Sequence, residues 1–268
     1  MAEHRLPKPA TRVRFPSPAP VFLLDTFTYV KVFFLKIKRG ESMERIKELF
    51  SKEGRYRLMP FCLSAAVINI LAYYIPKLIT ARGPWHNLAI GFDSLIPLIP
   101  ATIIIYGGAF LQWVLYYLRL ASDDIPVVSR YLTAELMSKA VCAVTFLVFP
   151  SCVSRPDIAG TDFFSVITKM MFFVDIPTCV FPSIHCLQSW LCMRYVLERK
   201  DFRASYKIFC VIFTLAVFAS TVTMKQHAVV DIPAGILLGE ICLTVCRHGA
   251  LTSPLEKRMT GYLKTTGR

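Results

Sequence analysis

The sequence has 268 residues and a formal net charge of +13, with 31 Lys and Arg residues against 18 Asp and Glu residues. Hydrophobic residues make up 54% of the chain and charged residues only 18%, whereas a soluble domain carries roughly 25% charged residues. This composition excludes a soluble nucleic-acid-binding protein, despite the basic charge, and excludes disorder over most of the chain. It favours a membrane protein with several spans, whose basic residues lie in the loops.

The N-terminal region differs from the rest of the chain. The first twenty residues include five prolines and four basic residues and show no hydrophobic periodicity. Met43 is a more natural start of the protein, because an amphipathic segment follows it and precedes the first apolar run. We therefore predict a disordered or misassigned extension at 1–42, a cytosolic amphipathic segment at 43–57, a catalytic domain at 58–247 and a cytosolic basic tail at 248–268.

Six apolar runs approach the ~20 residues that a helix needs to cross a bilayer. They cover residues 58–79, 95–118, 134–150, 179–197, 206–222 and 228–246. A seventh apolar stretch, 163–174, is too short to span and is expected to form an interfacial or re-entrant helix. The predicted fold is an all-α integral membrane protein, a bundle of six transmembrane helices.

The basic residues predict the orientation of this bundle. From residue 43 onward, seventeen Lys and Arg residues fall on one side of the predicted spans and five on the other. Because cytosolic loops carry the excess of basic residues, both termini are expected in the cytosol. We expect a multi-pass protein of a bacterial plasma membrane, in which Arg155, Lys225 and the start of the fourth span face outward.

Two histidines and a carboxylate are the candidate chemical groups at that outer face. His227 and Asp231 are four residues apart, so on a helix they would share one face, and the carboxylate would orient the imidazole. A structural His–Asp pair is an equally open interpretation of this spacing alone. His185 reaches the same face from the fourth span, and two imidazoles can divide attack and leaving-group protonation between them.

The same loops carry groups that could hold an anion. Arg155 can donate to two oxygens at once, and Lys225 adds a point charge. The fourth helix begins near Ser183, where its free N–H groups also favour an anion. An anion, two histidines and a lipid-bounded site together indicate phosphoryl transfer on a lipid.

The order of these motifs is specific. Arg155-Pro156, then Pro182-Ser183-Ile184-His185, then Ser220 followed by His227 and Asp231, each stand at a predicted helix boundary within 149–239. This part of the chain resembles the type 2 phosphatidic acid phosphatase superfamily, which includes lipid phosphotransferases and shares its site with vanadium haloperoxidases.

The resemblance implies a role for each of these residues. His227 would be the nucleophile that becomes phosphohistidine, Asp231 would orient it, and His185 would protonate the leaving group. The groups implied to bind the phosphoryl oxygens are Arg155, Ser183, the backbone N–H of Ile184, Lys225 and Ser220. The resemblance implies no metal and no cofactor. The expected substrate is a phospholipid or an isoprenyl phosphate or pyrophosphate, and nucleic acid is not an expected partner.

Three positions depart from the family pattern. Val148 stands where a Lys is usual, Thr221 where an Arg is usual, and Ile184 where a Gly is usual. Lys225, one helical turn beyond Thr221, is the candidate replacement for the missing charge. Ser-Thr in the third motif is similar to the inositol-phosphorylceramide and sphingomyelin synthase branch, and fewer cations suit a phosphodiester.

Several functions therefore stay open. A lipid phosphatase is favoured, because the commonest members of the superfamily hydrolyse, and a lipid phosphotransferase is the alternative. A metal protein that uses His185, His227 and Asp231 as ligands is a third, and a non-enzymatic membrane protein is a fourth. The sequence does not indicate the lipid or the oligomeric state.

Two further groups of residues have simpler expected roles. The nine cysteines lie mostly in apolar runs without Cys-x-x-Cys or zinc spacing, so they are expected to be buried thiols. Cys152 and Cys179 lie beside the same polar stretch and are the one pair considered for a disulfide. Asp157, Asp162 and Asp175 are expected to be solvated loop carboxylates.

Overall fold

The computed structural model of the protein describes residues 50–51 and 54–265. All of these belong to one compact unit, Glu44–Arg268. The extension predicted over 1–42 lies outside the described residues, as does most of the amphipathic segment predicted over 43–57.

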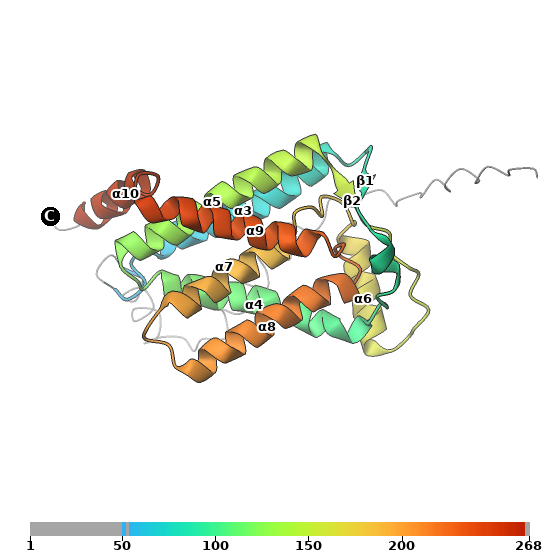
Figure 1. Ribbon diagram of the computed structural model, residues 1–268. Helices are drawn as coiled ribbons and strands as arrows, with labels where there is room; N and C mark the ends of the chain where they lie inside the picture. Colours follow the sequence, from blue (N-terminus) through green and yellow to red (C-terminus); the bar gives the residue numbers. More distant parts are fainter. Residues whose placement is uncertain (1–49, 52–53, 266–268) are drawn as a thin grey trace, which may run out of the picture. The chain divides into compact units, whose positions relative to one another are not determined.

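The described part of the chain is mostly helical. Its α-helices are α3 (Met59–Ile79), α4 (Ile103–Leu120), α5 (Ile125–Val148), α6 (Phe163–Val174), α7 (Ile184–Glu198), α8 (Ala204–Thr223), α9 (Asp231–Val245) and α10 (Ser253–Lys264). Two short strands, β1 (His86–Asn87) and β2 (Ser151–Cys152), and single 3-10 turns complete it. Within this unit α6 and the strands lie at one end of the bundle and α10 at the other (Figure 1).

Four helices are long and apolar enough to cross a membrane. They are α3 with 21 residues, Pro100–Leu120 with 21, α5 with 24 and α8 with 20. At ~1.5 Å per residue, helices of this length reach across a hydrocarbon core of about 30 Å. The outward faces of α3, α4 and α8 carry exposed apolar side chains such as Leu78, Ile104 and Ile208. The prediction of a membrane protein is thus supported for these four helices.

The remaining two predicted spans form shorter helices. α7 and α9 have 15 residues each, about 22 Å of helix. The spans predicted over 179–197 and 228–246 started too early, because residues 179–183 and 228–230 lie in turns ahead of these helices. Those turns contain or adjoin the polar motifs discussed below.

The boundaries of the other predicted elements vary in accuracy. The first and fifth spans and the short apolar helix coincide with α3, α8 and α6. The second and third were wrong at their starts, because residues 95–99 precede the helix Pro100–Leu120 and α5 begins nine residues before residue 134. Ser129 and Arg130 made this part of α5 look polar, yet Ser129 is buried inside the bundle and Arg130 forms an ion pair with Glu198 of α7.

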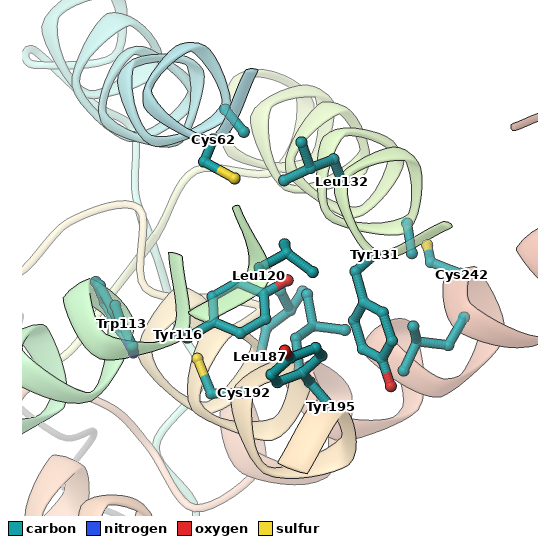
Figure 2. Close-up of a cluster of buried hydrophobic side chains, with 14 of the residues drawn as sticks. Cys62, Trp113, Tyr116, Leu120, Tyr131, Leu132, Leu187, Cys192, Tyr195 and Cys242 are labelled. Carbon is teal, nitrogen blue, oxygen red and sulfur yellow. The ribbon is translucent and has the colours of Figure 1, made fainter. Parts of the chain in front are cut away.

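The bundle packs around α7, which contacts α4, α5, α8 and α9. Figure 2 shows aromatic side chains of α4, α5 and α7 packed together in the core. Tyr195 of α7 meets Tyr131 of α5 and Tyr116 of α4 edge to face, with ring centroids 5.3 and 5.5 Å apart. Offset and edge-to-face aromatic pairs stabilise a core beyond the area they bury, so α7 has a fixed position against its neighbours.

Two buried charged residues of α5 lie within this apolar core. Glu135 and Lys139, one turn apart on α5, have no exposed surface and interact electrostatically. Tyr117 of α4 donates a hydrogen bond to Glu135. The second oxygen of Glu135 and the ammonium group of Lys139 make no hydrogen bond with the described residues.

The two strands tie distant loops together at the end of the bundle that holds α6. β1 and β2 pair in parallel, with His86 opposite Ser151. Cys152 also forms an antiparallel bridge with Thr178. These pairings hold the segment that contains Arg155 against the loop that leads into α7.

Candidate active site

The three sequence motifs meet at that same end of the bundle. Arg155 follows β2, His185 lies in the first turn of α7, and His227 lies in the turn between α8 and α9. Hydrogen bonds join Arg155 to the turn that holds His227, and the ring of His185 faces that of His227.

His227 occupies the α8–α9 turn because α8 ends abruptly. Lys225 adopts a left-handed backbone conformation with φ of 52°, and the N–H groups of Gln226 and His227 both donate to the carbonyl oxygen of Thr221, at 3.0 and 3.2 Å. The expectation that His227 and Asp231 share one helix face was therefore wrong, since only Asp231 is helical. Their side chains nevertheless contact each other.

The contacts of His227 define its tautomer. Its Nδ1 lies 3.0 Å from Oδ2 of Asp231 and 2.9 Å from the carbonyl oxygen of Val180. Both partners are acceptors, so Nδ1 carries the proton and Nε2 carries the lone pair. No described residue forms a hydrogen bond with Nε2, which leaves this nitrogen available as a nucleophile.

Asp231 is well placed to hold a negative charge. It is fully buried and is the first residue of α9, where the helix dipole favours an anion. Its Oδ2 also accepts a hydrogen bond from the backbone N–H of Ala228 at 3.0 Å. Oδ1 is buried and has no hydrogen-bond partner among the described residues.

His185 faces His227 from α7, with ring centroids 6.2 Å apart. Three aromatic rings of α4 surround it: Tyr106 at 4.2 Å, Trp113 at 5.1 Å and Phe110 at 5.3 Å between centroids. The hydroxyl group of Tyr106 lies 3.3 Å from Nδ1. Nε2 is buried without a hydrogen-bond partner in the described part of the chain, so it is the atom left for proton transfer.

Arg155 bridges the turn that holds His227 and the segment after α6. Its Nε donates to the carbonyl oxygen of Lys225 at 3.3 Å, and its Nη2 donates to Oε1 of Gln226. Its Nη1 donates to the carbonyl oxygen of Asp175 at 2.6 Å. The guanidinium group also lies over the ring of Phe172, 4.3 Å from its centroid. Nη1 also donates to the carbonyl oxygen of Phe172 at 3.4 Å, so four of the five N–H groups are engaged and one N–H of Nη2 is left for an anion.

Gln226 is a site residue that the sequence analysis missed. Only 3% of it is exposed. Because Arg155 donates to Oε1, the orientation of the amide is set, and Nε2 is left as a donor with no hydrogen-bond partner among the described residues. The signal in the sequence was a polar residue directly before His227, between two apolar helices.

The start of α7 supplies further donors. Ser183 is the N-cap residue, and its Oγ accepts a hydrogen bond from the N–H of Cys186 at 3.2 Å. The N–H groups of Ile184 and His185 belong to the first turn and have no partner within the helix. Ser183 therefore shapes this helix start, and the N–H of Ile184 stays available for an anion.

A glycine lets α9 approach this helix start closely. A Cβ atom on Gly235 would lie 2.8 Å from the carbonyl oxygen of Ser183 and 3.1 Å from the backbone nitrogen of Leu187. Gly235 thus permits a close contact between the two helices. It places the helix of Asp231 directly against the N-terminus of α7.

Two other predicted phosphate ligands already have partners. The ammonium group of Lys225 donates to the carbonyl oxygens of Asp93, at 2.8 Å, and Ile96. The hydroxyl group of Ser220 donates to the carbonyl oxygen of Val217 in its own helix, at 2.7 Å. Val148 is 78% exposed at the end of α5.

The loop carboxylates have roles beyond solvation. Asp162 caps α6 by accepting from the N–H groups of Phe164 and Ser165. Asp175 forms an ion pair with Lys77. Burial raises the pKa of Asp175, but the charges of Lys77 and Arg155 outweigh burial and hold this pKa below its ordinary value. The expectation of a solvated carboxylate was therefore wrong for Asp175.

The cysteines are thiols, and all nine lie in described positions. Eight are buried and Cys152 is partly buried, which agrees with the expected burial. Cys152 and Cys179, the pair considered for a disulfide, are both free. Burial raises the pKa of each of these two thiols.

The described residues place no group of three or more His, Cys, Asp or Glu side chains where they could jointly hold a metal ion. His185, His227 and Asp231 are therefore not such a group. Comparison of the chain with protein-family models, with curated proteins and with solved structures finds no match.

Proposed function

We propose that this protein is a membrane lipid phosphatase that hydrolyses a phosphate monoester or pyrophosphate lipid through a phosphohistidine intermediate. The observation that carries this proposal is the fixed tautomer of His227. Asp231 and the carbonyl oxygen of Val180 both accept from Nδ1, which leaves the Nε2 lone pair free on the histidine that lies beside His185.

In the proposed first step, Nε2 of His227 attacks the phosphorus atom. An N–P bond forms while the bond between phosphorus and the leaving oxygen breaks, and His185 gives its proton to that oxygen. Asp231 stabilises the positive charge that develops on the imidazole of His227. In the second step His185 takes a proton from water, the water oxygen attacks phosphorus, and the N–P bond breaks.

The phosphoryl oxygens would be held by donors from all three motifs. Arg155 supplies the charge, Nε2 of Gln226 supplies a neutral donor, and the N–H groups at the start of α7 complete the set. Donors fixed in place before the reaction stabilise charge that develops in the transition state.

The proposal includes a six-span arrangement with both termini in the cytosol. α7 and α9 are short as helices, but the turns ahead of each add length at the end of the bundle that holds the motifs. The bias of basic residues toward the opposite end would place the site at the outer face of the membrane. Cysteine-accessibility labelling of single-cysteine variants in intact cells tests this orientation.

A lipid phosphotransferase is the second candidate. One observation favours it: Lys225 donates to two backbone carbonyls and Arg155 to three and to Gln226, so each cation has one N–H donor left for the substrate. So few free cationic donors suit a phosphodiester, which carries less charge than a monoester. In this case the phosphoryl headgroup would pass from His227 to a lipid alcohol instead of water.

One experiment separates these activities. The purified protein is incubated with phosphatidic acid, with an isoprenyl pyrophosphate, and with a phosphodiester lipid plus ceramide or diacylglycerol. Phosphate release without headgroup exchange supports the phosphatase, and exchange without release supports the transferase. His227→Ala is expected to abolish either activity, whereas His86→Ala, an exposed histidine at the same end of the bundle, is the matched control. Full turnover by His227→Ala would refute both.

A further inference from the structure

The guanidinium group of Arg155 depends on a residue that is itself anchored to α3. Nη1 of Arg155 donates to the carbonyl oxygen of Asp175 at 2.6 Å. The carboxylate of the same Asp175 accepts hydrogen bonds from Lys77 and from the hydroxyl group of Tyr73, the latter at 2.8 Å. One residue thus links Arg155 to two side chains of a different helix.

The ammonium group of Lys77 has no donor left for a substrate. It donates to the carboxylate of Asp175, to the hydroxyl oxygen of Tyr73 at 2.8 Å, and to the carbonyl oxygen of Ile176 at 2.6 Å. An ammonium group carries three N–H donors, and the side chain of Lys77 is only 11% exposed. Lys77 therefore does not act as a direct phosphate ligand while these contacts hold.

Two of the three acceptors of Lys77 belong to the segment whose carbonyl oxygen accepts a hydrogen bond from Arg155. Asp175 and Ile176 connect α6 to the loop before α7. The ammonium group of Lys77 donates to the carboxylate of the first and to the carbonyl oxygen of the second. Removing the ammonium group would leave the carboxylate of Asp175 without its ion pair. The carboxylate would then turn toward water, and the carbonyl oxygen that orients Arg155 would move with it.

We propose that Tyr73, Lys77 and Asp175 form a positioning brace that holds the guanidinium of Arg155 in the orientation that binds the substrate phosphate. This inference rests on the proposed function, because it assigns the brace to the same anion site. The brace acts through Arg155 and touches neither the substrate nor the histidines.

The test measures anion affinity of the full-length protein in detergent, with orthovanadate as the probe. Lys77→Met is expected to weaken vanadate inhibition roughly tenfold, within the range of coupling between residues of one hydrogen-bond network. Lys169→Met is the matched control, since Lys169 is an exposed lysine of α6 that donates to the carbonyl oxygen of Gly160. Its vanadate affinity should equal that of the wild type.

A double mutant distinguishes positioning from general damage. If Lys77 acts through Arg155, then Lys77→Met should cause no further loss of vanadate affinity in an Arg155→Ala background. An equal loss in both backgrounds overturns the inference, as does unchanged affinity in the single variant. If Lys77→Met does not fold, Tyr73→Phe removes one hydrogen bond of the brace and should weaken vanadate binding about threefold.

The outcomes separate this inference from the proposed function. Turnover that survives His227→Ala refutes the function whatever the brace does. A wild-type protein that hydrolyses lipid through His227 and binds vanadate, together with a Lys77→Met variant of equal affinity, refutes the brace alone. Absence of both turnover and vanadate binding in the wild type refutes both.

Discussion

Oδ2 of Asp231, the first residue of α9, lies 3.0 Å from the imidazole Nδ1 of His227, which itself lies in the turn before that helix. The carboxylate thus reaches back along the chain to the ring and simultaneously accepts from the N–H of Ala228. The position of the first residue of α9 therefore sets the orientation of the imidazole ring. It also explains why the pair keeps its contact although the two residues do not share a helix.

The Asp231–His227 contact predicts the effect of an amide. In Asp231→Asn the side chain can donate to Nδ1, which would favour the wrong tautomer of His227 and protonate Nε2. We expect the turnover number to fall by roughly 10⁴-fold, as when an orienting aspartate is replaced in a catalytic triad. Asp157→Asn makes the same chemical change at an exposed carboxylate and should leave turnover unaltered. Equal turnover in the two variants would contradict the role of Asp231.

Gln226 is expected to bind the phosphoryl group through Nε2. Hydrogen bonds to a charged group are worth about 1.5–3 kcal/mol, so Gln226→Leu should weaken inhibition by inorganic phosphate about 10- to 100-fold. Gln112→Leu removes an amide that donates to Thr214 between α4 and α8 and serves as the control. Unchanged phosphate inhibition in Gln226→Leu would show that Nε2 faces no bound anion.

Gly235 has no room for a methyl group. A Cβ atom would lie 2.8 Å from the carbonyl oxygen of Ser183, so Gly235→Ala should separate α9 from the start of α7. Overpacking of this kind costs about 1–3 kcal/mol, and thermal unfolding in detergent should show the loss of stability together with reduced turnover. At Gly107 no atom lies within 4 Å of an added Cβ, and Gly107→Ala should change neither quantity.

Glu135 and Lys139 are expected to depend on each other for stability. Both side chains are fully buried one turn apart on α5, and removing one of two opposite buried charges leaves the other without compensation, at a cost of about 3–5 kcal/mol. We expect Glu135→Gln and Lys139→Met each to destabilise the protein strongly, and the double variant to lose less than the sum of the two. Unfolding free energies for the four proteins of this cycle measure the coupling, and strict additivity would mean that the two charges do not interact.

The pH dependence of stability should report on Asp175. Its carboxyl group has a folded pKa below the ordinary value of 3.8, because the charges of Lys77 and Arg155 outweigh the effect of burial. The stability that it contributes is therefore fully present above pH 3.8 and is lost as the pH falls through the lower folded pKa. In thermal unfolding of the wild type and of Asp175→Asn, the difference in stability should narrow as the pH falls below 3.8. A constant gap between them would exclude this carboxylate as the titrating group.

The sequence alone indicated a helical protein with long apolar helices and placed part of these helices correctly. α3, α6 and α8 coincide with their predicted ranges, because each is a single apolar run bounded by polar residues. The sequence also identified His185, His227, Asp231 and Arg155 as groups to examine together, since ionisable residues at the ends of apolar runs are costly unless they have a role.

Hydropathy failed where polar residues are buried. Ser129 and Arg130 hid the first turns of α5, because a hydropathy average assumes that polar groups face water, whereas Ser129 is buried and Arg130 forms an ion pair with Glu198 of α7. The same average extended the spans at α7 and α9 into turns, since it does not register where the backbone stops being helical.

Only the tertiary structure decided which candidate groups are free to act. The left-handed conformation of Lys225 turns its ammonium group onto the carbonyls of the α3–α4 loop, and Arg155 fixes the amide of Gln226 so that its nitrogen is the open donor. Lys77 and Asp175, 98 residues apart in the chain, meet beside Arg155. Such contacts depend on the path of the chain between distant segments, and spacing within a motif carries no information about that path.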